Sequence, residues 1–381
     1  YSYGKVGNDK LGERFPYLYT IAKSYKENDK DVTFPGWNWG DYGYGNSYDG
    51  MAYTQLASEN VTWEIATKHD IGVDLSLFND KFTATVDYFH EQRDGIYMER
   101  KYLPGIVGIV RRNPKANVGS GRSQGFDGHF AYKQKINRVN LTVRGNFTYS
   151  KNEILEKDEE NTVYPYQTEA GYRVNQAKGL IALGLFKDYD DIRNSPQQTA
   201  WGKVQPGDIK YADLNNDGKI DGNDQTYIGN PELPQISYGL GVSIQYKKWD
   251  ASIFFQGVGK RSIMLSDIHP FGGESYGVMQ FVADNHWTEA NPNPEAMYPR
   301  LTNGKNNNNN PNSTYWLRDG SYIRLKNVEL GYSYKFLRAY ISGQNLLTFS
   351  KFKLWDPELY TSNGLKYPTQ IMGSIGLQFT F

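Results

Sequence analysis

The chain has 381 residues, of which 38% are hydrophobic and 15% aromatic, and its formal net charge at pH 7 is zero. The balanced charge gives no indication of a nucleic-acid-binding surface, and no run approaches the roughly 18 consecutive apolar residues of a transmembrane helix. A water-soluble core of this size would normally contain more Leu, Ile and Val than this chain does. Their low content suits a membrane barrel, in which only alternate strand residues face lipid. The lack of cysteine excludes disulfides and thiolate metal sites.

The chain opens on Tyr1-Ser2-Tyr3-Gly4, which has the character of a strand already under way, and no signal peptide precedes it. We expect residues 1–4 to be an incomplete first strand, and the chain to be the C-terminal part of a longer one. Residues 5–60 are polar and rich in Gly, Tyr, Asn and Asp. A segment of this length and composition is typical of an extracellular barrel loop.

Four aromatic residues in this segment are candidates for substrate binding, because their rings could stack on sugars or on a peptide: Trp37, Trp39, Tyr42 and Tyr44. Packing of the loop on its neighbours or on a partner protein is the simpler explanation of the same residues.

From residue 71 onward, apolar and polar residues alternate with period two in a series of short segments. This pattern predicts strands with one apolar and one polar face. The segments are 71–77, 82–88, 126–132, 141–149, 236–246, 249–255, 328–334, 339–347 and 371–381. Their lengths fit the roughly 9–11 residues of a tilted membrane strand.

The connections between these segments alternate strictly between short and long. The short ones are 78–81, 135–138, 247–248 and 335–338, and the long ones are 5–60, 100–115, 151–234, 260–320 and 349–367. Short periplasmic turns and long extracellular loops are typical of outer-membrane barrels. Aromatic residues beside the short turns fit an interfacial girdle: Phe78, Tyr132, Tyr246, Trp249 and Tyr334. The prediction is therefore an all-β fold, an antiparallel transmembrane β-barrel to which this chain contributes about ten strands.

An open sheet edge is not viable in lipid, so the remaining strands must come from outside this chain. The polar face would line the lumen, with the charged residues Asp74, Asp87, Asp127, Arg144 and Glu329. These side chains could contact a substrate, although charges on an inner wall more often form ladders with one another.

The sharpest local motif spans residues 213–224, with the sequence DLNNDGKIDGND. Side-chain oxygens at loop positions 1, 3, 5, 9 and 12, a backbone carbonyl at position 7 and Gly at position 6 follow the spacing of an EF-hand calcium loop. The expected ligands are Asp213, Asn215, Asp217, Lys219, Asp221 and Asp224. We expect a structural Ca²⁺ that orders an extracellular loop; a metal-free, Asx-rich turn is the alternative. Asp at position 12 replaces the usual Glu, which favours weaker binding.

The sequence GDIKYADLNNDGKIDGNDQTYIGNPELPQISYGLGVSIQYKKWDASIFFQGVGK at 207–260 strongly resembles the C-terminal barrel region of SusC/RagA-type TonB-dependent transporters of Bacteroidota outer membranes. The segments GLFKDYDDIRNSP at 184–196, WLRDGSYIRLKNVELGYSY at 316–334 and ISGQNLLTFSKFKLWDPE at 341–358 match the same family in the same order. The resemblance also covers YSYGKVGN at 1–8 and 63–89, so it extends over nearly the whole chain.

The resemblance implies a barrel of roughly 22 strands filled by an N-terminal plug. It further implies TonB-driven import of oligosaccharides or oligopeptides together with a SusD-like surface lipoprotein. The plug, the TonB-contacting segment and the other strands have no counterpart in residues 1–381, which would form a single barrel segment.

Other functions remain as alternatives. A passive porin would lack the plug, and a soluble glycan-binding β-sandwich stabilised by calcium would bury its apolar faces. An outer-membrane enzyme would need a converging acid–base pair. The five His residues show no metal or catalytic spacing, so no enzymatic activity is predicted. The asparagine run at 306–310 is expected to be a solvated loop.

Overall fold

The computed structural model describes residues 1–9, 11, 15–27, 30–33, 36–39, 46–48, 50–58, 60–101, 113–159, 162–266, 278–303 and 306–380. Within these ranges, no helix is both long enough and apolar enough to cross a membrane.

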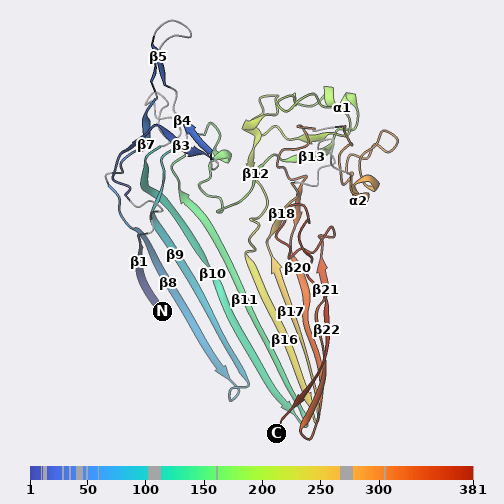
Figure 1. The fold of residues 1–381 in the computed structure, drawn as a ribbon. Coiled ribbons are helices and arrows are strands. Elements are labelled where there is room, and N and C mark those ends of the chain that lie inside the picture. Colours follow the sequence, from blue (N-terminus) through green and yellow to red (C-terminus); the bar gives the residue numbers. More distant parts are fainter. Residues whose placement is uncertain are drawn as a thin grey trace.

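The main element is a 10-stranded antiparallel sheet, whose strands are long, tilted and ordered in space as they are in the chain (Figure 1). The order is β1 (Ser2–Asn8), β8 (Glu64–Leu77), β9 (Phe82–Glu99), β10 (Lys115–Ile136), β11 (Val139–Glu156), β16 (Ile236–Tyr246), β17 (Trp249–Gly259), β20 (Tyr322–Tyr334), β21 (Leu337–Ser350) and β22 (Met372–Phe379). The predicted number of strands and their antiparallel connection are confirmed.

Several strands are longer than the sequence pattern predicts. The first strand continues to Asn8 and pairs with residues 64–70 of β8, so it is not a four-residue stub. β9 and β10 remain paired up to Glu99 and Lys115, beyond the alternating segments from which they were predicted. Most residues of these strand ends are polar or Gly, so the alternation of apolar and polar residues marks only part of each strand.

Register carries the two faces of the sheet from strand to strand. Directly paired residues share a face, and one row runs through Val73, Val86, Gly128, Phe147, Tyr238 and Gly257. The neighbouring row runs through Asp74, Thr85, His129, Asn146, Gly239 and Gln256. The first row is mostly apolar and the second mostly polar, so one polar face extends through the six strands from β8 to β17.

Many side chains of the apolar face are exposed in the described part of the chain. Ile375 is 86% exposed, Leu377 is 61% exposed and Ile341 is 54% exposed. A β-sandwich would bury such a face against a second sheet. A continuous exposed apolar face fits a barrel wall in lipid and argues against the sandwich.

The short turns lie at one end of the sheet, which we call the turn end (Figure 1). Their first residues take left-handed conformations at Asn137, Lys247 and Lys335. Aromatic rings and lysines gather there: the Lys248 ammonium lies 4.4 Å from the centre of the Tyr334 ring, and the Trp249 and Tyr332 ring centres are 4.8 Å apart. Such amphipathic pairs suit a membrane–water interface.

The long connections lie at the opposite end, the loop end. In the connection between β1 and β8, the described residues form three two-stranded ribbons. They pair β2 (Thr20–Ala22) with β7 (Ala52–Gln55), β3 (Ser24–Glu27) with β4 (Lys30–Thr33), and β5 (Trp37–Trp39) with β6 (Asn46–Tyr48).

The connections after β11, β17 and β21 pack together, and their described residues are called the cap below. The cap has three small sheets, which pair β12 (Lys178–Gly179) with β15 (Thr226–Tyr227), β13 (Ala182–Leu185) with β14 (Ile209–Tyr211), and β18 (Ser262–Met264) with β19 (Leu317–Asp319). Its helical turns are α1 (Tyr189–Arg193), α2 (Gln280–Asp284), η2 (Pro165–Gln167) and η3 (Gly222–Asp224).

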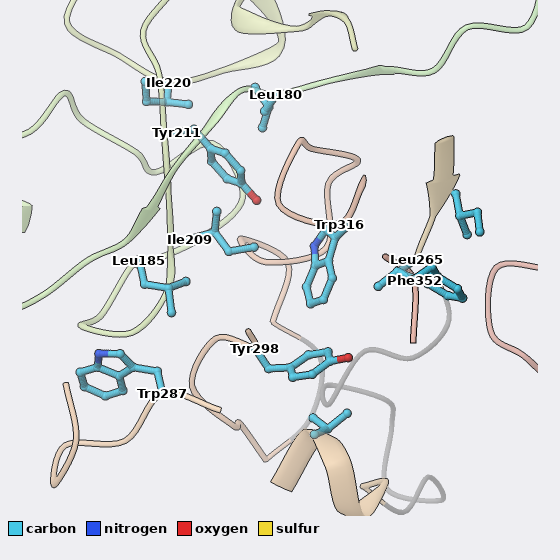
Figure 2. Close-up of a cluster of buried hydrophobic side chains, with 12 residues drawn as sticks. Leu180, Leu185, Ile209, Tyr211, Ile220, Leu265, Trp287, Tyr298, Trp316 and Phe352 are labelled. Carbon is cyan, nitrogen blue, oxygen red and sulfur yellow. The ribbon is translucent and has the colours of Figure 1, made fainter. Parts of the chain in front are cut away.

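The cap has a hydrophobic core of its own (Figure 2). The first connection contributes Ile209 and Tyr211, the second contributes Tyr298 and Trp316, and the third contributes Phe352. Burial of these large side chains supplies much of the free energy that holds the connections together. The sequence pattern predicts these segments only as separate loops, so this core is an additional feature of the structure.

Backbone geometry at Gly207 shows how closely the cap is packed. Gly207 has φ +84°, and a Cβ atom there would lie 2.3 Å from Cε3 of Trp287. Only glycine combines this conformation with this contact.

Candidate functional site

The polar face of the sheet carries every residue predicted to face the lumen, since register places Asp74, Asp87, Asp127, Arg144 and Glu329 on that face. Asp87 and Asp127 are directly opposite each other on β9 and β10. Like charges in direct pairing destabilise a sheet, so this region favours a cationic partner or solvating water.

Near the turn end, the same face carries a ladder of opposite charges. The Arg338 guanidinium donates to the carboxylates of Asp250 and Glu329 and so links β17, β20 and β21. This arrangement matches the simpler explanation of wall charges as ladders. Nothing in the contacts of Arg338 assigns it to a substrate.

The cap is organised around a buried carboxylate. Asp208 is fully buried, and its Oδ1 accepts hydrogen bonds from Arg300 Nε at 2.8 Å, Asn306 Nδ2 at 2.9 Å and Asn309 Nδ2 at 3.0 Å. Its Oδ2 accepts from the backbone N–H of Gln205 at 2.9 Å. A buried charge is tolerated when it is paired and hydrogen-bonded in this way.

The asparagine run is part of this network, which corrects the prediction of a solvated loop. Asn308 and Asn309 are 1% and 0% exposed. The backbone carbonyl of Asn308 accepts from the Tyr211 hydroxyl at 2.8 Å, and the backbone carbonyl of Asn309 accepts from Trp316 Nε1 at 2.7 Å. Polarity alone predicts solvent exposure, whereas the side-chain amides of Asn308 and Asn309 pair with the buried backbone groups of Ile209.

A second buried cation joins the cap to the sheet. Arg324 of β20 is 1% exposed and forms ion pairs with Asp356 and, at 2.7 Å, with Glu358 Oε2. The adjacent Arg261 donates through Nη1 to the Pro357 carbonyl at 2.5 Å. These contacts therefore fix the connection after β21 to the loop end of the sheet. Sequence reasoning missed both arginines, since neither lies in a motif that distinguishes a buried tether from a surface charge.

The Asp-rich loop folds as a compact turn. Asp213 Oδ2 accepts from the Gly218 backbone N–H at 2.8 Å. Buried Asp224 accepts from the N–H groups of Leu214 and Asp221, both at 2.8 Å. η3 begins at this point, with Asp221 and Asp224 forming a capping box.

The oxygen donors of this loop fit a calcium ion in part. Asp213 Oδ1 is buried and has no hydrogen-bond partner, as expected of an atom reserved for a cation. In the described part of the chain, however, no three His, Asp or Glu side chains converge as ready metal ligands. Asp217 Oδ1 and Asp221 Oδ1 accept from backbone N–H groups of Lys219 and Asn223 and would have to share these oxygens with the ion.

The predicted aromatic platform is not brought together within the described residues. Trp37 and Trp39 lie on β5, whose backbone pairs with β6, but their side chains lie outside the described residues. Tyr42 and Tyr44 lie outside them entirely. Their role in substrate binding stays a prediction.

Comparison with known proteins agrees with this geometry. No model of a known protein family matches the chain. TonB-dependent receptor P3 of Formosa agariphila is 27% identical over 391 residues, which cover 94% of this chain and 35% of that protein. TonB-dependent receptor SusC of Bacteroides thetaiotaomicron is 23% identical over 402 residues, which cover 100% of this chain and 37% of that protein.

A solved structure of the RagAB peptide transporter superposes with a TM-score of 0.68 at 20% identity, covering 100% of this chain and 40% of the other. A second structure, of the RagAB peptide importer in an open-open state, gives 0.69. The chain therefore shares the antiparallel β-barrel fold of these structures along its full length. The resemblance to SusC/RagA-type TonB-dependent transporters is confirmed, and the chain spans between 35% and 40% of the length of these relatives.

Proposed function

We propose that this chain forms part of the barrel wall, and the cap, of a TonB-dependent importer of large nutrients in the outer membrane. One observation carries the proposal: a polar face and an exposed apolar face pass from strand to strand through a 10-stranded antiparallel sheet, in a fold shared along the full length of this chain with RagAB. The apolar face suits contact with lipid, and the polar face suits a water-filled lumen through which substrate passes.

The proposed importer works with other components. The similarity to SusC and the RagAB fold support a SusD-like surface lipoprotein as partner on the cap side, and TonB as the source of energy through a plug outside these residues. The substrate class is oligosaccharide or oligopeptide, and the Bacteroidota source of the relatives supports the same outer-membrane setting.

Uptake measurements test this proposal. Cells that produce the protein should accumulate labelled oligosaccharide or peptide, and dissipation of the proton-motive force should abolish accumulation. Accumulation that survives the uncoupler would indicate a passive porin instead. Purification in detergent should also recover a lipoprotein in stoichiometric amount, and a protein that stays folded and monomeric without detergent would refute the membrane location.

A structural Ca²⁺ in the loop 213–224 is a second, separate proposal, supported by the partnerless buried Oδ1 of Asp213. The ion would be held by Asp213, Asn215, Asp217, Asp221 and Asp224 with the Lys219 carbonyl, and it would supply positive charge that orders the loop. Burial, and next the Asp224 carboxylate, raise the pKa of Tyr166, whose hydroxyl donates to the Asn223 carbonyl.

Calcium titration in hydrogen-exchange experiments tests the site. Added Ca²⁺ should slow exchange at the amides of Gly218 and Lys219, and Asp213→Asn should remove this effect. Asp190→Asn, an exposed carboxylate elsewhere in the cap, is the matched control. Exchange that does not respond to calcium in the parent protein would leave the loop as a metal-free turn.

A further inference from the structure

A cavity of about 460 Å³ lies where the three connections of the cap meet. The first connection contributes Asn175 and Asn230, the second contributes Ser262 and Met264, and the third contributes Tyr360. Its volume falls within the roughly 300–1,000 Å³ of small-molecule sites. No residue of this cavity belongs to the Asp-rich loop or to the predicted aromatic platform.

The polar side of the cavity lining is held in place by specific contacts. Arg173 Nη1 donates to Asn230 Oδ1 at 2.7 Å, and the Asn230 backbone N–H donates to Ser262 Oγ at 3.0 Å. Because Oδ1 is engaged by a cation, the amide presents its Nδ2 group as a donor to the cavity. This part of the cavity lining is therefore preorganised, which lowers the free-energy cost of binding a ligand.

Close packing at Gly229 brings this side of the cavity lining against the rest of the cap. Gly229 has φ +61°, and a Cβ atom there would lie 2.2 Å from Leu317 Cδ2. The Gly229 carbonyl accepts from Gln176 Nε2 at 2.9 Å. The backbone beside the cavity thus has one well-defined position, as a binding site requires.

The charge of the cavity lining disfavours anionic ligands. Among the described residues that line the cavity, Glu232 is the one acidic residue and none is Lys, Arg or His. Burial, and next the Glu232 carboxylate, raise the pKa of the Tyr360 hydroxyl. Arg261 donates to the backbone carbonyls of Glu232 and Pro357 rather than to a ligand in the cavity. Among the lining residues themselves, an anionic ligand would therefore meet a carboxylate and no cationic side chain, and the nearby Arg173 is already engaged by Asn230 Oδ1.

The remaining lining combines hydroxyl and amide groups with a small apolar surface. Ser266 and Asn363 add polar groups, and Ala177, Met264 and Leu317 add apolar ones. This combination matches a pyranose ring, which has a rim of hydroxyl groups and a face of C–H groups. A peptide is recognised differently, by pairing with a strand edge or by charges that meet its termini.

We propose that this cavity binds one neutral sugar residue of an oligosaccharide and makes the protein selective for neutral over uronate-containing glycans. The inference rests on the importer function proposed above and names the substrate class of that importer. Asn230 Nδ2 and Glu232 are the groups that hydrogen-bond the sugar hydroxyls, and the apolar residues cover its C–H face.

Titration calorimetry on the whole protein in detergent tests the proposal, with neutral gluco-, xylo- and manno-oligosaccharides, a uronate-containing oligosaccharide and a mixture of short peptides as probes. Asn230→Asp keeps the acceptor for Arg173 and replaces the Nδ2 donor by an acceptor. We expect it to weaken binding of the best neutral glycan about tenfold or more, the effect of one lost hydrogen bond plus one unpaired group. Asn194→Asp, an exposed amide elsewhere in the cap, should change nothing.

Glu232→Gln provides an independent measurement, since it removes the negative charge without changing the volume. It should raise affinity for the uronate-containing probe, and hydrogen exchange of the cap should show that both variants remain folded. Unchanged neutral-glycan binding in Asn230→Asp would overturn the proposal. Peptide binding without glycan binding would overturn it as well, while leaving the importer function standing; absence of energy-dependent uptake of any probe would refute the importer function itself.

Discussion

Replacement of Asp208 by Asn should loosen the cap while leaving the sheet intact. The variant keeps one oxygen for Arg300 Nε and the two asparagine amides, but its new NH₂ group faces the Gln205 backbone N–H, at 2.9 Å in the parent, and Arg300 Nη2, at 3.3 Å. Donors then face donors. Arg300 also loses its counter-charge, and its side chain is 21% exposed, so water relieves only part of the loss.

Breaking one side of a buried ion pair costs about 3–5 kcal/mol, and the partial exposure of Arg300 places the expected loss near the lower end. A loss of about 3 kcal/mol in opening free energy accelerates amide exchange by about two orders of magnitude. The amides of Ile209 and Tyr211 report this directly, because they donate to Asn309 Oδ1 at 2.8 Å and Gln198 Oε1 at 3.0 Å.

Hydrogen exchange followed by mass spectrometry provides the assay. Peptides that cover 208–211 and 306–316 should exchange faster in Asp208→Asn, whereas peptides from β16 and β17 should not change. Asp190→Asn is the control, since its carboxylate is exposed and paired only with Arg193 at the surface. Equal protection of Ile209 and Tyr211 in the two variants would refute the view that Asp208 holds the cap together.

Three further predictions concern the wall and the cap. Ile341→Arg, on the exposed apolar face, should cost about 2–4 kcal/mol of stability in bilayers, whereas Ser342→Arg on the polar face should cost much less, as measured by folding titrations in lipid vesicles; equal losses would contradict the assigned faces. Burial raises the pKa of Asp191, but hydrogen bonds from Lys210 and the Lys187 backbone outweigh it and lower the net pKa. Its stabilisation is therefore present above the unfolded value of about 3.9 and lost as pH falls through the folded value, so Asp191→Asn should flatten the acid dependence of cap exchange, and an unchanged profile would refute this. Gly207→Ala should destabilise the cap by about 1–3 kcal/mol through its φ of +84° and overlap with the buried indole, and normal cap exchange in this variant would contradict the strain argument.

The sheet could be predicted from the sequence because its information is local and repeated. Each strand shows alternation, and an aromatic or a polar turn marks where it reverses, as at Trp249 and Lys335. One correctly assigned strand fixes the faces of its neighbours, because register carries the assignment from Asp74 to His129 and on to Gln256.

The cap could not be predicted in this way, because its contacts are non-local and aperiodic. Asp208 and Asn309 are about a hundred residues apart in sequence but hydrogen-bonded at 3.0 Å. No period links them, and asparagine and aspartate are also the commonest residues of solvated turns. The motif at 213–224 was visible because all its oxygens lie within twelve positions, but spacing does not show which of them already accept backbone N–H groups.

The same difference separates what each part of the chain contributes to function. The wall must present an apolar face to lipid and a polar face to water, and many alternating sequences do so. Its polar face carries small polar side chains, paired charges such as Arg338 with Asp250 and Glu329, and like charges in direct opposition such as Asp87 and Asp127. Discrimination among substrates requires groups fixed by contacts from more than one direction. Asn230 meets this condition through Arg173 and Ser262, so selectivity is better sought where the three connections meet than along the wall.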